Sequence, residues 1–274
     1  MTNMDYIFFG TPRFAEIVFQ ELCEKGMPPA YVVCNPDRPQ GRSGTITPPP
    51  VKVYAERQSV PVLQPKDSKE LFEMLSGLSV SYGVVAAYSM IIPSPVLSLF
   101  EAVFGVHPSL LPLYRGSSPI QYALLDGVAK TGVSIYLLDE KMDHGPIVAS
   151  QETSVSEDET YVSLEEKLAH IGGSLVRTSL LDHKQGVQTS HEQDHTQATF
   201  TKKIATEDGY VDLEKDAPED IYRKIRALYP EPGVYTYIEG KRTKLLSAHR
   251  EDNTIVVDEI VPEGKAPREE RIVL

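Results

Sequence analysis

Short apolar runs alternate with amphipathic stretches along the first half of the chain. Residues 6–10 form an apolar run that predicts a strand, and apolar side chains at helical spacing predict a helix over 12–25. A β-branched run over 80–88 predicts a central strand that is buried on both faces. Further strands are expected over 31–34, 102–107 and 132–138, and a long helix over 156–183.

This alternation of strands and helices predicts an α/β fold with a largely parallel sheet and helices on both faces. Ligands of such sheets bind beyond the carboxyl ends of the strands. Tyr88, His107 and the residues after Leu138 each follow a predicted strand. We therefore expect these residues to share one edge of the sheet.

The pattern changes after residue 184. Residues 185–201 are polar, amide-rich and weakly periodic, which predicts a linker. A helix is expected over 217–228, with strands over 233–238 and 254–260. The predicted organisation is a large α/β domain over 1–184, a linker over 185–201 and a small β-rich domain over 202–274.

Composition narrows the class of protein. The 274 residues are 41% hydrophobic and 24% charged, as in an ordinary soluble domain. No apolar run reaches the ~20 residues of a membrane helix, and no secretion signal is expected at the N-terminus. Two cysteines are too few for a disulfide framework, so a reduced, cytoplasmic setting is expected. The net charge of −12 argues against charge-driven adhesion to nucleic acid, so an RNA partner would need a few placed contacts.

Two polar segments carry candidate chemistry with an ordinary alternative. Residues 191–195 read H-E-Q-D-H, the letters of a zinc signature, but polar flanks give no apolar helix face to hold a metal. We therefore expect no metal site. The Pro- and Gly-rich segment 36–50 carries Arg38 and Arg42 and fits neither a helix nor a strand interior. It is either a solvated connection or a basic finger for a phosphate-bearing partner.

His107 stands at the end of a predicted strand, and Asp139 and Asp143 follow the next one. A neighbouring carboxylate favours the imidazolium form of a histidine. Such a pair could donate a hydrogen bond to a developing oxyanion and carry protons. A lone histidine after a strand is more often structural, so spacing alone leaves both interpretations open.

Several longer segments resemble one known family. They are FFGTPRFA, NPDRPQGR, VHPSLLPLYRGSSPIQYALLDG, TGVSIYLLDEKMDHGPI and QATFTKKIATEDGYVDL. On these segments the chain is similar to the 10-formyltetrahydrofolate-dependent formyltransferases, and among them to the methionyl-tRNA formyltransferases. The resemblance implies a Rossmann-like formyltransferase domain, a small OB-like barrel after it, and no metal.

The resemblance implies transfer of a formyl group from 10-formyltetrahydrofolate to the α-amino group of methionyl initiator tRNA, a step of translation initiation. It implies catalytic roles for His107 and Asp143 and tRNA contacts by Arg38 and Arg42. A cytoplasmic monomer with no membrane partner is expected. The residues implied in folate binding are Ser109, Leu110, Leu111, Pro112, Ala86, Tyr88, Ser89, Met90, Ile91 and Asp139.

One position departs from the family pattern. Gly105 stands where the family has a catalytic asparagine, so one donor to the oxyanion is missing. Loss of such a donor costs about 10²–10³ in rate. A water or a neighbouring side chain could fill the gap, the enzyme could be weak, or the protein could bind folate without transferring a group. We expect Gly105→Asn to raise turnover by at least about tenfold with little change in folate affinity, and equal rates would mean that the gap is already filled.

A second departure from the family pattern follows Arg42, and two other functions are open. The segment after Arg42 has no lysine before Lys52, which predicts weak and mildly salt-dependent tRNA binding. A formyltransferase acting on a small amine, such as an amino-sugar nucleotide, would need no tRNA-docking domain. A non-catalytic folate-binding homologue is the third possibility, and Gly105 is its direct support.

Overall fold

The computed structural model describes residues 5–40, 44–252 and 254–274. The chain forms two compact units. The first comprises Met1–Arg115, Gly132–Glu152 and Glu166–Thr199, and the second comprises Gly116–Thr131, Thr153–Glu165 and Phe200–Leu274. No described helix combines the length and the apolar character that a bilayer crossing demands.

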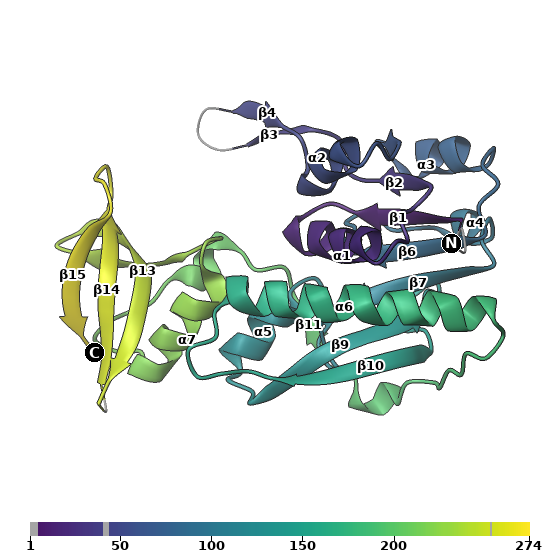
Figure 1. The fold of residues 1–274 in the computed structure, drawn as a ribbon. Helices are drawn as coiled ribbons and strands as arrows, with labels where there is room; N and C mark the ends of the chain where they lie inside the picture. Colours follow the sequence, from purple (N-terminus) through teal and green to yellow (C-terminus); the bar gives the residue numbers. More distant parts are fainter. Residues whose placement is uncertain (1–4, 41–43, 253) are drawn as a thin grey trace. The chain divides into compact units, whose positions relative to one another are not determined.

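A seven-stranded sheet organises the first unit, in the order β10-β9-β7-β6-β1-β2-β5 (Figure 1). The five strands from β7 to β5 in this order run parallel, whereas β9 runs antiparallel to β7. The predicted α/β fold with a mainly parallel sheet is confirmed. The strands are β1 (Tyr6–Gly10), β2 (Tyr31–Val33), β5 (Val62–Leu63), β6 (Tyr82–Ala86), β7 (Ala102–His107), β9 (Lys130–Leu137) and β10 (Ile147–Ser154).

Helices cover both faces of this sheet because alternate strand residues are apolar on each side. On one face, α1 (Arg13–Glu24) stacks Phe19 on Phe8 of β1, with ring centroids 5.4 Å apart. Gly172 of α6 (Tyr161–Lys184) lies against Val106 of β7 on the same face. In Figure 1, α1 and α6 lie in front of the strands.

The opposite face carries α3 (Ser68–Leu75) and α4 (Ser94–Leu97). Leu71 of α3 and Val96 of α4 are fully buried in one cluster with Phe9 of β1. Asp67 caps α3, since its carboxylate accepts hydrogen bonds from two backbone N–H groups of the first turn. A further helix, α2 (Pro50–Arg57), packs against α1.

Two predictions about local structure are wrong. The long helix begins at Tyr161 rather than near 156, because the hydroxyl of Thr160 accepts from the backbone N–H of Ser163 at 3.2 Å and caps the helix there. Segment 36–50 contains a hairpin of β3 (Arg38–Gln40) and β4 (Thr45–Thr47), with Pro39 opposite Ile46. Both strands of an isolated hairpin are edge strands, so a proline is tolerated.

The second unit contains an antiparallel sheet within residues 200–274, together with two segments from earlier in the chain. Helix α7 (Pro218–Leu228) begins with a proline and two acidic residues, which suit a helix N-terminus. Its apolar face packs against a four-stranded antiparallel sheet in the order β12-β13-β14-β15. The other elements of this unit are β12 (Val234–Ile238), β13 (Lys241–Glu251), β14 (Thr254–Pro262), β15 (Arg268–Val273), the helix α5 (Pro119–Leu125), the short strand β11 (Phe200–Thr201) and the second residue of the short strand β8 (Arg115–Gly116).

Candidate active site

His107 ends β7, and its side chain is buried with 6% exposure. The preceding Val106 faces α6, so His107 points to the opposite face of the sheet. Its Nε2 lies 2.8 Å from the carbonyl oxygen of Tyr114. A carbonyl only accepts, so Nε2 carries a proton and donates it. The ring edge that faces the rest of the site is therefore Nδ1.

The carboxylate of Asp143 faces this edge, with Oδ1 3.7 Å from Nδ1 of His107. The expected common edge of the sheet does not explain the approach, because β9 is antiparallel to β7 and ends at the other edge. Instead the turn after β9 doubles back, with the N–H of Leu137 donating to the carbonyl of Pro146 at 2.9 Å. Asp143 has a φ of 50°, in the left-handed region, at the bend of this turn.

Gln193 holds the bend from the polar segment that the sequence predicts to be a linker. Its side chain is buried with 5% exposure. Its amide nitrogen donates to the backbone carbonyls of Asp143 at 3.0 Å and Gly145 at 2.7 Å. Its amide oxygen accepts from Nη2 of the buried Arg115 at 2.6 Å. This part of the chain therefore braces the loop that carries Asp143.

The same segment contains the zinc-like letters. His191 forms an isolated β-bridge with Ile147, and His195 begins a 3₁₀ helix, so the two histidines share no α-helix face. Among the described residues no group of three or more His, Cys, Asp or Glu side chains could hold a metal ion. His195 instead stacks on His144, with ring centroids 4.0 Å apart.

Gly105 lies opposite Tyr136 in the register of β7 and β9. A Cβ atom on Gly105 would lie 2.3 Å from Cε1 and 2.5 Å from Cζ of the Tyr136 ring. Of the alternatives for the gap beside Gly105, the structure shows a neighbouring side chain, because the ring of Tyr136 fills this space. The hydroxyl of Tyr136 donates to Oδ1 of Asp143 at 2.7 Å.

Comparison with known proteins identifies the family of the chain. A model of the formyl transferase family matches residues 4–180, and a model of its C-terminal domain matches residues 203–267. The chain belongs to the formyl transferase family. Methionyl-tRNA formyltransferase of Thermotoga neapolitana is 39% identical over 254 residues, which cover 92% of this chain and 81% of that protein.

Solved structures share the fold. The methionyl-tRNA formyltransferase of Clostridium thermocellum superposes with a TM-score of 0.64 at 18% identity, over 94% of this chain and 98% of that one. HypX from Aquifex aeolicus in complex with tetrahydrofolic acid superposes with a TM-score of 0.69 at 17% identity. The match covers all of this chain and 46% of HypX.

In this formyl transferase the segment after His107 is held by a buried hydroxyl. Ser134, opposite His107 in the register, donates to the carbonyl of Ser109 at 2.8 Å and accepts from the N–H of Leu111 at 2.9 Å. The hydroxyl of Ser109 donates to the carbonyl of Leu113 at 2.6 Å. Leu111 packs on Tyr136. Residues 109–112, including Leu110 and Pro112, thus run beside His107 in a fixed conformation.

The segment after β6 leaves the sheet beside them. Ala86 pairs with Val106 in parallel register, so residues 87–91 and 108–113 start at the same edge of the sheet. Ile91 is 81% exposed and Leu113 is 40% exposed, which is unusual for large apolar side chains. This edge of the sheet therefore presents exposed apolar side chains next to backbone polar groups.

The other predicted site residues lie in different surroundings. Tyr88 is half-buried, with its ring 5.8 Å from that of Phe9 and its hydroxyl 3.8 Å from Sδ of Met90. The hydroxyl of Ser89 accepts from Nδ2 of Asn35 at 2.8 Å. Asp139 lies 2.7 Å from Nδ1 of His144. Arg38 is exposed on the β3–β4 hairpin, and Arg42 lies outside the described residues.

Three polar residues of the site escape the sequence patterns considered above: Ser134, Tyr136 and Gln193. The strand 132–137 contains the only signal for the first two. Ser134 and Tyr136 alternate with Val133 and Ile135, so one face of an otherwise apolar strand is polar. Gln193 has no such signal, because an amide in a polar segment looks like any other.

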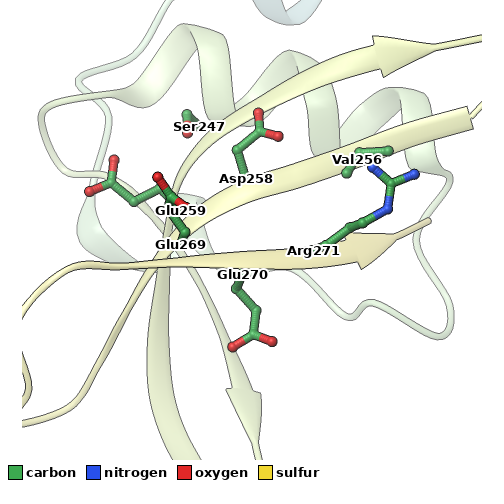
Figure 2. Close-up of a pocket in the computed structure, with 7 residues that line it drawn as sticks. All are labelled: Ser247, Val256, Asp258, Glu259, Glu269, Glu270 and Arg271. Carbon is green, nitrogen blue, oxygen red and sulfur yellow. The ribbon is translucent and has the colours of Figure 1, made fainter.

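A hollow on the sheet of the second unit shares no residue with this site (Figure 2). Its lining is mainly acidic, and the side chain of Arg271 is paired with Glu251. Such a surface repels phosphate groups. The residues that line it are Ser247, Val256, Asp258, Glu259, Glu269, Glu270 and Arg271.

Proposed function

We propose that this protein transfers the formyl group of 10-formyltetrahydrofolate to the α-amino group of methionine on initiator tRNA. The observation that carries the proposal is the approach of Nδ1 of His107 and Oδ1 of Asp143 to 3.7 Å, beside the fixed segment 109–112. The 39% identity to a methionyl-tRNA formyltransferase over most of the chain supports the choice of acceptor. This role goes with a cytoplasmic, monomeric enzyme.

10-Formyltetrahydrofolate supplies the formyl carbon and a nitrogen that leaves with a proton. An α-amino group has a pKa of about 7.7–8.0, so part of it is neutral and nucleophilic near pH 7. In the imidazolium form both ring nitrogens of His107 carry a proton, and in this proposal the N–H at Nδ1 donates to the negative charge that develops on the formyl oxygen. Because Nε2 is held by the carbonyl of Tyr114, the ring cannot turn this edge away.

Asp143 completes the proton path. The amine loses one proton as its bond to the formyl carbon forms, and the leaving nitrogen gains one as its bond breaks. A carboxylate beside the imidazole accepts the first proton, and the pair returns a proton to the leaving nitrogen. The buried brace of Gln193 keeps this carboxylate in place between the two events.

An exposed cluster in the second unit suits a nucleic acid. We call Tyr210, Tyr235, Tyr237 and Arg242 the tyrosine patch. Tyr237 is 58% exposed and Tyr210 is 41% exposed. The guanidinium carbon of Arg242 lies 3.8 Å from the centre of the Tyr235 ring. Exposed rings with an arginine can stack on unpaired bases, which supports contact with the single-stranded end of a tRNA.

Cations for phosphate contacts are scarce. Lys52, the first lysine after the hairpin, has its Nζ 2.8 Å from Oδ2 of Asp37 and 2.9 Å from Oε1 of Gln64. It therefore neutralises a carboxylate of its own chain. Arg38 on the hairpin stays a proposed phosphate contact. The expected tRNA affinity is modest and depends weakly on salt.

Single-turnover formylation tests the proposal. The enzyme with 10-formyltetrahydrofolate should formylate initiator methionyl-tRNA much faster than elongator methionyl-tRNA or an amino-sugar nucleotide. If the enzyme preferred the sugar nucleotide, the proposed acceptor would be wrong and the proposed formyl transfer would stand. Folate binding without transfer to any amine would contradict the enzymatic assignment.

A further inference from the structure

One oxygen atom joins three side chains of the site. Oδ1 of Asp143 accepts the hydrogen bond of the Tyr136 hydroxyl at 2.7 Å, and the same atom lies 3.7 Å from Nδ1 of His107. The carboxylate side chain is only 13% exposed. Its direction is therefore set by protein groups more than by water.

The ring of Tyr136 has no freedom to move away. It is buried with 7% exposure in a cluster with Leu111 and Ile147, and Leu138 packs against the same cluster. Its edge lies over Gly105, where a Cβ atom would come within 2.3 Å. A residue with any side chain at position 105 would displace this ring.

The hydroxyl of Tyr136 stays protonated. Burial raises its pKa well above the usual value, and the negative charge of Asp143 raises the pKa further. Asp139 acts in the same direction and Arg115 in the opposite one. Tyr136 is therefore a permanent donor in the pH range in which an amine can attack.

A phenol has one proton to donate. The proton of Tyr136 is directed at Asp143, so the hydroxyl cannot also serve a developing oxyanion. Its influence on the reaction must pass through the carboxylate. This separates it from a group that touches the reacting atoms.

We propose that Tyr136 is a positioning residue for formyl transfer, which holds the carboxylate of Asp143 opposite Nδ1 of His107, and that Gly105 is the residue that makes room for its ring. The inference rests on the proposed function. It explains why a glycine stands beside the catalytic histidine without leaving a hole.

The variant Tyr136→Phe keeps the ring and removes the hydroxyl. A hydrogen bond to a charged group contributes enough to predict a fall in kcat between about tenfold and a hundredfold. KM for the folate should change less than about twofold, since the ring still fills its space. The pH–rate profile should also differ from that of the parent, because the carboxylate of Asp143 has lost its hydrogen-bond donor.

Tyr161→Phe is the matched control. The hydroxyl of Tyr161 also donates to a carboxylate at 2.7 Å, that of Glu165, but within helix α6. The control removes the same kind of hydrogen bond, so thermal unfolding should show a comparable loss of stability. Its kcat and pH–rate profile should match those of the parent.

Two results would overturn the inference. One is a Tyr136→Phe enzyme with the kcat and pH profile of the parent. The other is an equal loss of kcat in both variants, which would mean that stability alone is responsible. If the parent formylates no amine, the proposed function fails separately. The ¹⁵N resonances of His107 then decide the positioning role, because only Tyr136→Phe should change their chemical shifts.

Discussion

Tyrosines serve the two units in opposite ways. Tyr136 in the first unit is 7% exposed, its ring is enclosed and its hydroxyl reaches a carboxylate. Tyr237 in the second unit is 58% exposed, and its ring lies within 6.2 Å of the rings of Tyr210 and Tyr235. In one place the hydroxyl carries the interaction, and in the other the ring face is presented to solvent.

The difference follows from burial. A buried hydroxyl must have a partner, and a partnered hydroxyl in a low-dielectric corner fixes the direction of whatever it binds. An exposed hydroxyl exchanges hydrogen bonds with water at little gain, whereas the exposed ring keeps its area for stacking. Phenylalanine should therefore be harmful in the first setting and harmless in the second.

Removing the imidazole should give the largest effect. His107→Ala deletes the donor at Nδ1 and leaves Asp143 without its neighbour, so turnover should fall by about 10²–10⁴. Folate binding should change little, because segment 109–112 is held by Ser134. Single-turnover formylation and folate fluorescence titration measure the two quantities. If His107→Ala retained the turnover of the parent, the contact between His107 and Asp143 would have a structural role only.

The second largest effect should come from removing the side chain of Gln193, which holds the loop that carries Asp143. Gln193→Ala removes the donor to the carbonyls of Asp143 and Gly145, so the free energy of unfolding should fall by about 2–3 kcal/mol. Turnover should fall as well, since the loop loses its hold on the carboxylate. Gln197→Ala, an exposed amide in the same segment, should stay within about 0.5 kcal/mol of the parent. Urea unfolding measures both variants. Equal free energies of unfolding for Gln193→Ala and Gln197→Ala would mean that the hydrogen bonds of Gln193 do not stabilise the loop.

A substitution of Gly105 should have the next largest effect. Gly105→Asn forces atoms into the ring of Tyr136, and such overpacking costs about 1–3 kcal/mol of unfolding free energy. Turnover should fall in the parent background. It should recover in part when Tyr136→Val makes room for the asparagine. A single Gly105→Asn variant that is faster than the parent would contradict the arrangement of β7 and β9.

Much of the fold could be predicted because its signals are local. The apolar runs at β1, β6 and β7 and the helical spacing of α1 appear in the sequence as they appear in the structure. Strands β13 and β15 were missed because charged residues fill their exposed faces. In β13, Thr243 and Leu245 point inward while Arg242 and Lys244 alternate with them.

The candidate site could be predicted only in part. His107 and Asp143 come together as expected, but for a reason that spacing cannot reveal. The antiparallel direction of β9 depends on how the whole sheet assembles, and the left-handed φ of Asp143 belongs to a non-glycine residue. The ring of Tyr136 occupies the space that a side chain at Gly105 would need, and this contact joins two neighbouring strands. A single sequence contains no signal for such a pair until their register is known.

The smallest effect should come from the exposed side of the comparison. Tyr237→Ala removes a ring face that is available for stacking, which is worth about 1–3 kcal/mol per base. Because the tyrosine patch has three rings, we expect the lower end, about fivefold in tRNA affinity at fixed salt. Tyr237→Phe should bind like the parent, since it keeps the ring. Filter binding with initiator tRNA measures the affinity of both variants. If Tyr237→Phe bound as weakly as Tyr237→Ala, the hydroxyl of Tyr237 would also contact the tRNA.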